Sequence, residues 1–382
     1  MRRHKLLSAL LGLLVLLTPV WWSLGSALSD PGLGTSLSAR LAEWARGHGG
    51  ESLVTWMETA WYSHHAPPVG GSPQKGAIPA NRSASTPAVS PRAPAHLPVP
   101  PAMIPIANRS VPGEGVWRSA GRLVDGTPAI YEAFMRPDTV HTSEVVGVAW
   151  MDTKLLRAAL YSGSTIPGGG PWQQTAPISD QAAGSLVAAF NSGFRMSNAD
   201  GGYYTQGTMV VPLRQGAASF VIYTDGTATV GMWGRDVSMT PGVVAIRQNL
   251  DLVVDGGQPV PGLHSSNNAR WGSTLGGAVY VWRSGVGITA DGALVYAGGP
   301  GLDISSLANV LVHAGAVRAM EFDINTSWVN LATYAPPSPI GLATPSNGTD
   351  LLSNMAGSPS RYFEPWWSRD FITMSARSSP RP

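Results

Sequence analysis

From about residue 106 onward, short apolar runs alternate with glycine, proline and Asp-Gly pairs. Apolar runs bounded by such turn-forming residues predict β-strands. The predicted strands cover 145–150, 186–191, 207–212, 219–223, 227–232, 243–247, 279–282, 286–289, 294–297 and 317–324. Asp225-Gly226 and Asp291-Gly292 each separate two such runs, and they predict tight hairpins whose two central residues have positive φ.

Two helices are predicted among these strands. Residues 305–314 carry apolar side chains at helical spacing, with Asp303 or Ser305 as the N-cap and Gly315 after the last turn. A shorter helix is predicted over 179–184. Few helices among many strands indicate an α+β domain, in which the helices pack on a largely antiparallel or mixed sheet.

The N-terminus combines basic residues with a long apolar run. Arg2, Arg3 and Lys5 precede residues 6–28, which are uncharged and rich in leucine. This run is long enough to cross a hydrocarbon core of about 30 Å. It predicts either a retained transmembrane anchor or an export signal cleaved near Gly25-Ser26-Ala27. The basic residues keep the N-terminus in the cytoplasm, so the rest of the chain is expected outside the cell membrane, or secreted if the signal is cleaved.

The stretch between this run and the predicted strands has two parts. Residues 29–65 hold two short patterns of Leu, Trp and Met at helical spacing, which fit either helices lying on the bilayer surface or a packed extension of the main domain. Residues 66–105 are rich in Pro, Ala, Ser and Gly and predict a disordered linker. The exported domain is then expected to cover residues 106–382.

Composition narrows the class of protein. Of 382 residues, 43% are hydrophobic and 13% charged, which supplies a sizeable core, and the net charge of +2 provides no basic face for nucleic acid. The chain has no cysteine, which excludes disulfides, thiolate nucleophiles, cysteine-based metal sites and a lipoprotein anchor.

The predicted strand 317–324 carries the clearest candidate chemistry. Side chains alternate between the faces of a strand, so Glu321, Asp323 and Asn325 share one face. Two carboxylates placed in this way can act as acid and base or share a cation. The alternative is an ordinary solvated outer face.

Two further polar positions interrupt apolar strands. Asn191 and Gly193 follow the run 186–190, where a strand end can present an amide and backbone N–H groups to a ligand, although an ordinary turn gives the same pattern. Arg283 lies within an apolar strand pair and needs either an internal carboxylate, such as Glu321 or Asp323, or an anionic substrate such as a phosphate.

A polar loop with an aromatic residue lies between two of the predicted strands. It contains His264 and the sequence Asn267-Asn268-Ala269-Arg270-Trp271. Trp271 is a candidate for stacking on a sugar ring. His264 is expected to be a surface histidine.

In this order and spacing, these elements resemble the phosphodiester glycosidase family over residues 185 to 335. The family pattern has an Asn-x-Gly-Phe element, an Arg-x-x-x-Gly strand with an Asp-Gly hairpin, a helix, a Gly-Ala turn and a strand ending in Asp-Gly-Gly-Gly-Ser. The matching residues are Asn191, Gly193, Phe194, Arg283, Gly287, Asp291, Gly292, the helix from Ser305, Gly315, Ala316 and Asp323. The chain departs from the pattern after Asp323, where Ile324 and Asn325 replace glycines that would let backbone amides cradle a phosphate or sugar.

The resemblance implies hydrolysis at a sugar-1-phosphate linkage. Arg283 would clamp the anion, and Asp323 would activate water, attack the anomeric carbon or hold a divalent cation. Glu321 would orient Asp323. The resemblance further implies that Asn191 binds a sugar hydroxyl or a phosphate oxygen, with Ser327 retained from the family motif; no cofactor is required by the sequence.

The sequence therefore predicts a membrane-anchored, extracytoplasmic glycosidase acting on a sugar-1-phosphodiester or a related cell-wall glycan linkage. A non-catalytic protein that binds cell-wall glycan on the same scaffold is the alternative. A third interpretation is a structural partner of a membrane complex that docks through residues 37–61.

Overall fold

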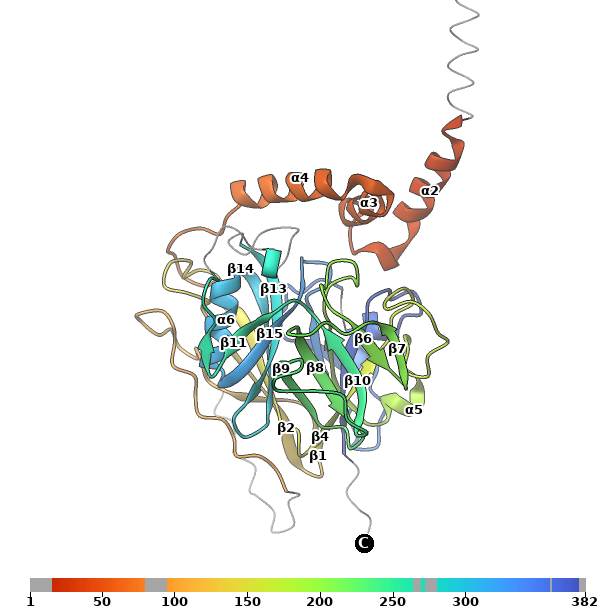
Figure 1. Ribbon diagram of the computed structural model, residues 1–382. Coiled ribbons are helices and arrows are strands. Elements are labelled where there is room, and N and C mark those ends of the chain that lie inside the picture. Colours follow the sequence, from red (N-terminus) through yellow and green to blue (C-terminus); the bar gives the residue numbers. More distant parts are fainter. Residues whose placement is uncertain (1–15, 80–94, 264–268, 272–279, 358, 378–382) are drawn as a thin grey trace, which may run out of the picture. The chain divides into compact units, whose positions relative to one another are not determined.

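A computed structural model describes residues 16–79, 95–263, 269–271, 280–357 and 359–377 (Figure 1). The chain divides into two compact units, Met1–Met57 and Glu58–Pro382. Each unit is described by itself below.

The first unit is helical. Its elements are α2 (Thr18–Ser29), a short 3₁₀ turn (Pro31–Leu33), α3 (Leu37–Ala45), a kinked turn (Arg46–Gly50) and the start of α4 (Glu51–His64). The indole of Trp44 donates a hydrogen bond to the hydroxyl of Ser23 at 2.9 Å, which ties α3 to α2. Both helical patterns predicted within 29–65 are therefore present as α3 and α4.

The predicted transmembrane run falls only partly on the described chain. Residues 6–15 lie outside the described residues, and α2 covers Thr18–Ser29. No helix among residues 16–79, or elsewhere in the described chain, combines the length and the apolar character needed to cross a bilayer.

The second unit is built from three β-sheets. The large sheet has the strand order β1 (Arg118–Val124), β2 (Thr127–Met135), β3 (Val146–Met151), β14 (Leu294–Leu302), β13 (Val281–Thr289), β15 (Ala316–Ile324), β11 (Leu252–Asp255) and β12 (Gln258–Pro259). A second sheet has the order β7 (Thr208–Val211), β6 (Tyr203–Thr205), β10 (Val243–Gln248), β8 (Ala218–Tyr223) and β9 (Ala228–Met232). The third has the order β17 (Gly348–Asp350), β16 (Leu331–Tyr334), β5 (Leu186–Asn191), β18 (Phe371–Ala376) and β4 (Leu156–Tyr161).

Neighbouring strands in these sheets run antiparallel wherever the described residues pair them, as in β13 with β15 and β5 with β18. The architecture is thus rich in strands and poor in helices, which confirms the predicted fold class at that level. Residues 281–282 of the first predicted run and the whole of the run 286–289 belong to the single strand β13 (Val281–Thr289), and residue 279 lies outside the described residues.

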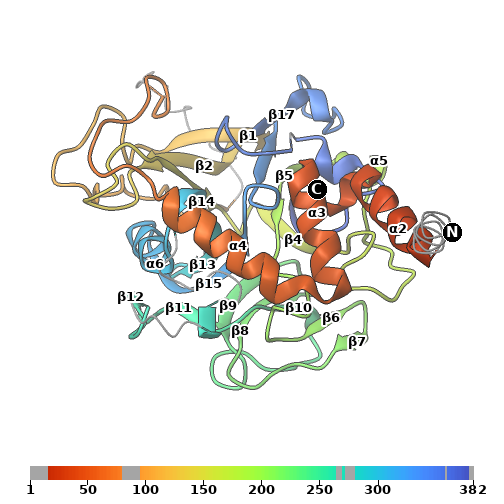
Figure 2. The same ribbon diagram turned by 90° about the horizontal axis from the view of Figure 1, so that it is seen from above.

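Helix α6 (Ile304–His313) covers part of the large sheet, beside β13 and β15 (Figure 2). Its start is fixed by a capping box: the Asp303 carboxylate accepts from the Ser306 N–H at 2.7 Å, and the Ser306 hydroxyl accepts from the Asp303 N–H at 3.0 Å. Gly285 of β13 lies beneath it, where a Cβ would come within 3.0 Å of Leu311 and 3.3 Å of Leu307. A second helix, α5 (Asp180–Ala183), lies within the predicted range 179–184, and Ser179 caps its start.

The predicted hairpins form, but their turns differ from the prediction. At Asp225-Gly226 only the glycine has a positive φ, of 79°, and the Gly226 N–H donates to the Tyr223 carbonyl, so the turn is a type I turn followed by a glycine bulge. Asp291-Gly292 follows the same pattern, with a φ of 90° at Gly292. Turns with two positive φ angles occur instead at Asp125-Gly126 and Gln206-Gly207.

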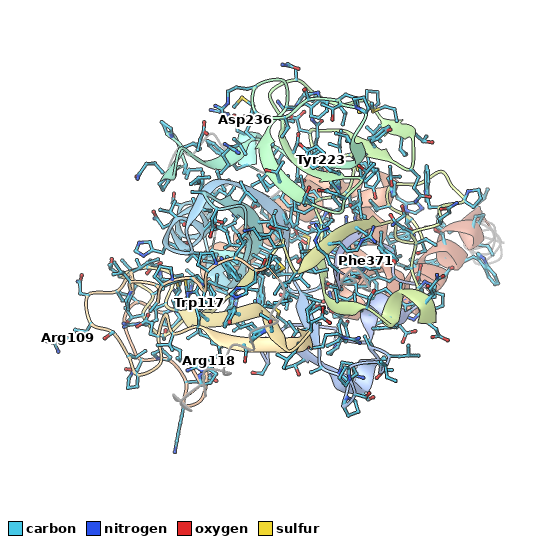
Figure 3. The ribbon with its side chains drawn as sticks, turned by 90° about the horizontal axis from the view of Figure 1, so that it is seen from below. Arg109, Trp117, Arg118, Tyr223, Asp236 and Phe371 are labelled. Carbon is cyan, nitrogen blue, oxygen red and sulfur yellow. The ribbon has the colours of Figure 1, made fainter. Side chains whose placement is uncertain are left out.

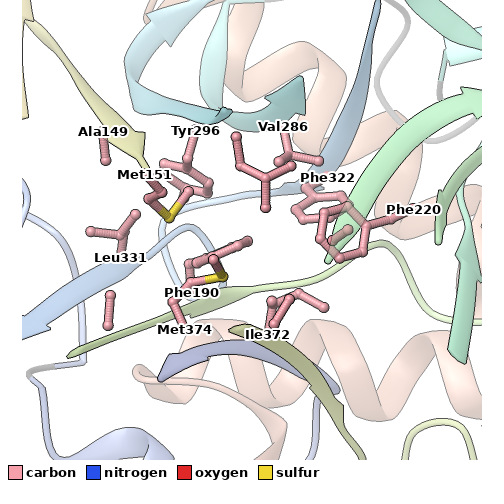
Figure 4. Packing of buried hydrophobic residues seen from close by; sticks show 14 of the residues in the cluster. Ala149, Met151, Phe190, Phe220, Val286, Tyr296, Phe322, Leu331, Ile372 and Met374 are labelled. Carbon is pink, nitrogen blue, oxygen red and sulfur yellow. The ribbon is translucent and has the colours of Figure 1, made fainter. Parts of the chain in front are cut away.

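The hydrophobic core lies where the three sheets face one another. Phe322 of β15, Phe220 of β8 and Phe190 of β5 contribute one ring from each sheet, with centroids 6.0 Å apart for Phe220–Phe322 and 6.3 Å apart for Phe190–Phe322 (Figure 4). All three rings are buried. A single aromatic cluster therefore holds the three sheets together.

The compact unit begins at Glu58, ahead of the boundary expected at residue 106. Leu97 and Met103 are buried in the core between α6 and the large sheet, and the Leu97 N–H donates to the Asp152 carboxylate at 2.7 Å. The Pro79 carbonyl accepts from Arg118 at 2.6 Å. Residues 66–79 and 95–105 thus belong to the folded unit, because a few apolar side chains anchor segments that are otherwise polar. Residues 80–94 lie outside the described residues.

Because Phe322 joins all three sheets, we expect Phe322→Ala to lower the free energy of unfolding by about 3–5 kcal/mol. Urea unfolding followed by fluorescence measures the change. Val244→Ala, at an exposed position of β10, is the control and should change stability by about 0.5 kcal/mol or less. Similar losses in both variants would contradict the central role of this ring.

Candidate functional site

Arg283 and Glu321 form an ion pair between neighbouring strands of the large sheet. The Arg283 Nη1 lies 2.6 Å from the Glu321 Oε1, and the two side chains are 1% and 0% exposed. The Arg283 Nε also donates to the Leu302 carbonyl at 3.0 Å. The face that carries Glu321 is therefore interior rather than solvated, and the partner of the arginine is the internal carboxylate.

The protonation of Glu321 is finely balanced. Burial raises the pKa of its carboxyl from 4.5 to about 7, with the Arg283 charge acting in the opposite direction and the Asp323 charge adding to the rise. Its Oε2 has no hydrogen-bond partner among the described residues. A carboxyl with a pKa near neutrality exchanges its proton readily at physiological pH, which is a property of catalytic acids and bases.

Asp323 lies two residues further along β15 and faces a second guanidinium. Its Oδ2 is 3.9 Å from the Nη1 of Arg369, and the side chains are 6% and 7% exposed, respectively. Arg369 in turn lies over the ring of Trp328, at 4.3 Å from the centroid. Two carboxylates and two arginines are thus gathered at the end of β15.

Arg369 was not among the residues predicted from the sequence. It precedes β18 together with Asp370, whose carboxylate pairs with the Arg247 Nε at 2.8 Å, both side chains being fully buried. The two neighbours therefore serve different sites, one beside Asp323 and one beside Arg247. The sequence signal that could have indicated these residues is a charged Arg-Asp pair directly before an apolar strand, because charges that become buried there need partners.

Asn191 lies in the same cluster but is fully occupied by protein partners. Its amide nitrogen donates to the Ser284 hydroxyl at 2.9 Å and to the Ser192 carbonyl at 3.0 Å. Its amide oxygen accepts from the Tyr296 hydroxyl at 2.8 Å and the Asn330 N–H at 3.1 Å. An asparagine side chain has two donors and two acceptor positions, so this arrangement uses all four. Asn191 acts here as a structural junction.

Ser284 joins this junction to Asp323. Its hydroxyl accepts from Asn191 and donates to the Asp323 carbonyl at 2.7 Å. The Asp323 N–H donates to the Ser192 carbonyl at 2.9 Å. Asn191 and Asp323 are therefore brought together through backbone and hydroxyl contacts.

Gly193 permits a close approach, but the neighbour is a protein side chain. A Cβ at this position would come within 2.9 Å of the Asn249 Oδ1. Asn249 accepts from the Phe194 N–H at 3.0 Å and donates to the Glu321 carbonyl at 2.9 Å. Asn249, which the sequence did not single out, thus links the Asn191 turn to β15.

The turn after β15 keeps a glycine-like backbone without glycine. Asn325 has a φ of +82°, a conformation that asparagine adopts more readily than most residues. The N–H groups of the turn are already engaged: Ile324 donates to the Asp323 Oδ1, Asn325 to the Trp282 carbonyl, and Ser327 to the Asn325 Oδ1. These amides point at protein acceptors rather than at a ligand.

Ser327 is 3% exposed and lies in a loop held from below by Arg361. The Arg361 Nη1 donates to the carbonyls of Ser327 and Trp328 at 3.2 and 3.5 Å, and its guanidinium lies over the Trp367 ring. Burial lowers the pKa of Arg361. The loop beside Asp323 is therefore fixed at its backbone.

Trp271 lies away from this cluster. Its side chain is 2% exposed, packs in the core beneath α6, and donates to the Leu252 carbonyl at 3.3 Å. An indole buried in this way offers no face to a sugar, so the stacking role predicted for Trp271 does not fit its position. His264, Asn267 and Asn268 lie outside the described residues.

The sequence alone does not decide whether Asp323 holds a divalent cation. Within the described ranges, no three His, Asp or Glu side chains gather where they could hold a metal ion. Asp323 has Arg369 as its charged neighbour, which is an arrangement suited to an anion bound beside a carboxylate rather than to a cation.

Comparison with known proteins gives limited likeness. No protein-family model matches the chain, and no curated protein matches it. Among solved structures, the catalytic domain of zebrafish N-acetylglucosamine-1-phosphodiester alpha-N-acetylglucosaminidase, auto-inhibited by its pro-peptide, has 15% identity and a TM-score of 0.42, covering 69% of this chain and 88% of that one.

Two other solved structures are similar to a lesser degree. A hypothetical protein from Synechocystis has 12% identity and a TM-score of 0.38, covering 66% of this chain and 63% of that one. A putative exported protein from Burkholderia pseudomallei has 13% identity and a TM-score of 0.31, covering 61% and 74%. Likeness of this degree carries no argument about activity.

Because the pKa of Glu321 in the folded chain is about 7, above its ordinary value of 4.5, the folded state holds this proton more tightly than the unfolded state. The stability that this group contributes is therefore complete below pH 4.5 and is lost as the pH rises through 7. Urea midpoints measured from pH 4.5 to 8 should fall for the wild type, and Glu321→Gln should flatten the decline.

Glu132 of β2, whose pKa burial also raises to about 7, provides a matched comparison. Glu132→Gln should remove a separate part of the same slope, and the double variant should be flatter than either single one. A wild-type slope that survives Glu321→Gln unchanged would contradict the assignment.

Proposed function

We propose that the chain is an extracytoplasmic glycosidase that hydrolyses a sugar-1-phosphodiester or a related cell-wall glycan linkage. The observation that carries this proposal is the group of charges at the end of β15: the Asp323 carboxylate beside the Arg369 guanidinium, with the buried Arg283–Glu321 pair on the same strand pair. A carboxylate beside an arginine offers a reacting group and an anion site within one substrate's reach.

Arg369 takes the role of anion clamp. A phosphate monoester is a weakly basic leaving group, so its departure needs stabilisation of negative charge more than it needs a strong proton donor. The planar guanidinium of Arg369 is held over Trp328 beside Asp323, whereas Arg283 is held at 2.6 Å by Glu321. Arg283 is thus a positioning residue for Glu321.

Asp323 acts on the anomeric carbon, either through water or by direct attack. In the water route, the bond from the anomeric carbon to the phosphate oxygen breaks and its electron pair leaves with the phosphate. The water oxygen bonds to the carbon, and its proton passes to Asp323. Glu321, fully buried and with a pKa of about 7, acts on Asp323 through its charge.

One observation favours the second function, a non-catalytic protein that binds cell-wall glycan. The N–H groups of Ile324, Asn325 and Ser327 donate within the protein, so the turn after Asp323 has lost the glycine cradle of the family pattern. In that case Asp323 and Arg369 recognise a ligand without turning it over.

We further propose that residues 6–28 direct export and either remain as an anchor or are cleaved. The support is the sequence of this run and the basic residues before it.

We expect Asp323→Asn to lower the release of free sugar from hexose 1-(methyl phosphodiesters) by about 10²–10⁴-fold, because the carboxylate is the reacting base or nucleophile. Arg369→Lys should lower it by about 10²–10³-fold. Reducing-sugar assays measure both. Thr208→Ala, at an exposed position of β7, is the control and should keep wild-type activity and folding.

No turnover by the wild type on any of these hexose 1-(methyl phosphodiesters) would contradict the glycosidase and leave the glycan-binding protein. If Asp323→Asn is folded and as active as the wild type, Asp323 takes no part in the mechanism.

A further inference from the structure

A groove of about 840 Å³ opens on the second unit, between the third sheet and the second. Strand β4 and the neighbouring β18 form one wall, and β8 and β10 form the other. Figure 3 labels Tyr223, which lines the groove, and Phe371, whose ring stacks on the lining residue Tyr161 at 5.2 Å. Its lining includes none of Arg283, Glu321, Asp323 and Arg369, so it is a separate feature. Its volume is in the usual range for small-ligand sites.

Uncharged amides dominate the polar lining. Gln173, Gln174, Gln181 and Gln206 line the groove together with several serine and threonine hydroxyls. Among the described residues of the lining, Arg157 is the one charged residue and none is a carboxylate. This set lacks the acidic partners that a cation needs and the several basic residues that a polyanion needs.

The amides of Gln173, Gln174 and Gln181 are exposed, and their side chains make no hydrogen bond to any other described residue. Each amide offers two donors and an oxygen acceptor. A sugar hydroxyl both donates and accepts, so a row of free amides matches it in both roles. An apolar ligand would instead strip water from these groups without replacing their hydrogen bonds.

The backbone that carries Gln173 and Gln174 is held in place before any ligand arrives. The Gln206 Oε1 accepts from the Gln173 N–H at 2.9 Å, which joins the β6–β7 turn to the loop that carries Gln173 and Gln174. The Gln174 carbonyl accepts from the Ser162 N–H at 3.0 Å, next to the end of β4. Fixed backbone positions reduce the entropy lost when a ligand binds. Tyr223, partly exposed on the opposite wall, offers an aromatic surface to the C–H groups of a sugar.

We propose that this groove binds a neutral oligosaccharide chain, independently of the Asp323 site. The groove would hold a glycan to the protein by hydrogen bonds from its glutamines and by contact with Tyr223. This binding site does not require that the chain be an enzyme, and it stands or falls separately from the glycosidase.

The test uses the full chain and measures binding of cellopentaose, chitopentaose and mannopentaose by titration calorimetry, with trigalacturonate as an anionic probe. At least one neutral oligosaccharide should bind. Gln173→Ala/Gln174→Ala should weaken it by about tenfold or more, because two amides are lost. Tyr223→Ala should also weaken it.

Two variants serve as controls. Gln215→Ala removes an exposed glutamine outside the groove and should leave the affinity within about twofold, a difference well below 1 kcal/mol. Asp323→Asn should bind as the wild type does, whatever its effect on turnover. Circular dichroism and thermal midpoints confirm that each variant is folded.

The proposal is overturned if no neutral oligosaccharide binds at millimolar concentration, or if only trigalacturonate binds. It is also overturned if the glutamine variant binds as tightly as Gln215→Ala. Binding lost in Asp323→Asn but kept in the glutamine variant would assign the glycan to the other site and likewise overturn it.

Discussion

The ion pair between Arg283 and Glu321 is the constraint on which the end of the large sheet depends. Removing a guanidinium and a carboxylate from water costs several kcal/mol per ion, and only close contact with further hydrogen bonds offsets that cost. Here the contact is 2.6 Å, and Arg283 also reaches the Leu302 carbonyl. The pair crosses from β13 to β15, so a shift in the register of these strands would leave both charges buried and unpaired. The same register sets the position of Asp323 on β15.

A network of polar contacts extends this constraint to the neighbouring sheet. Asn191 uses all of its hydrogen-bonding positions, and one of its partners, Ser284, also donates to the Asp323 carbonyl. Asn249 links the Gly193 turn to β15. Satisfied buried networks are rigid because each member loses a partner if another moves. The charged cluster is thus held by side chains whose own hydrogen-bonding positions are all used within the protein. The residues that hold the site are therefore different from those that face a ligand.

The pattern of apolar runs predicted some strands closely, since β5 has the predicted bounds and β15 differs by one residue. It missed others altogether, among them β1, β2, β4, β16 and β18. It also identified Glu321 and Asp323 as facing away from Phe322. Alternation cannot show what covers a face, so neither the burial of Glu321 nor that of Trp271 followed from it. Arg369 and Asn249 were missed because their partners are distant in the chain. The polar composition of 66–105 predicted a disordered linker, because it gave no weight to Leu97 and Met103, whose buried side chains anchor the segment.

Asn325 is a position at which the folded backbone would accept glycine. Its backbone already has the left-handed φ of +82° that glycine favours. An exchange between asparagine and glycine here needs no rearrangement of the folded backbone, only the loss or gain of the Oδ1 that accepts from Ser327. The course of this turn is thus set by its backbone conformation, and the asparagine side chain adds one hydrogen bond to it.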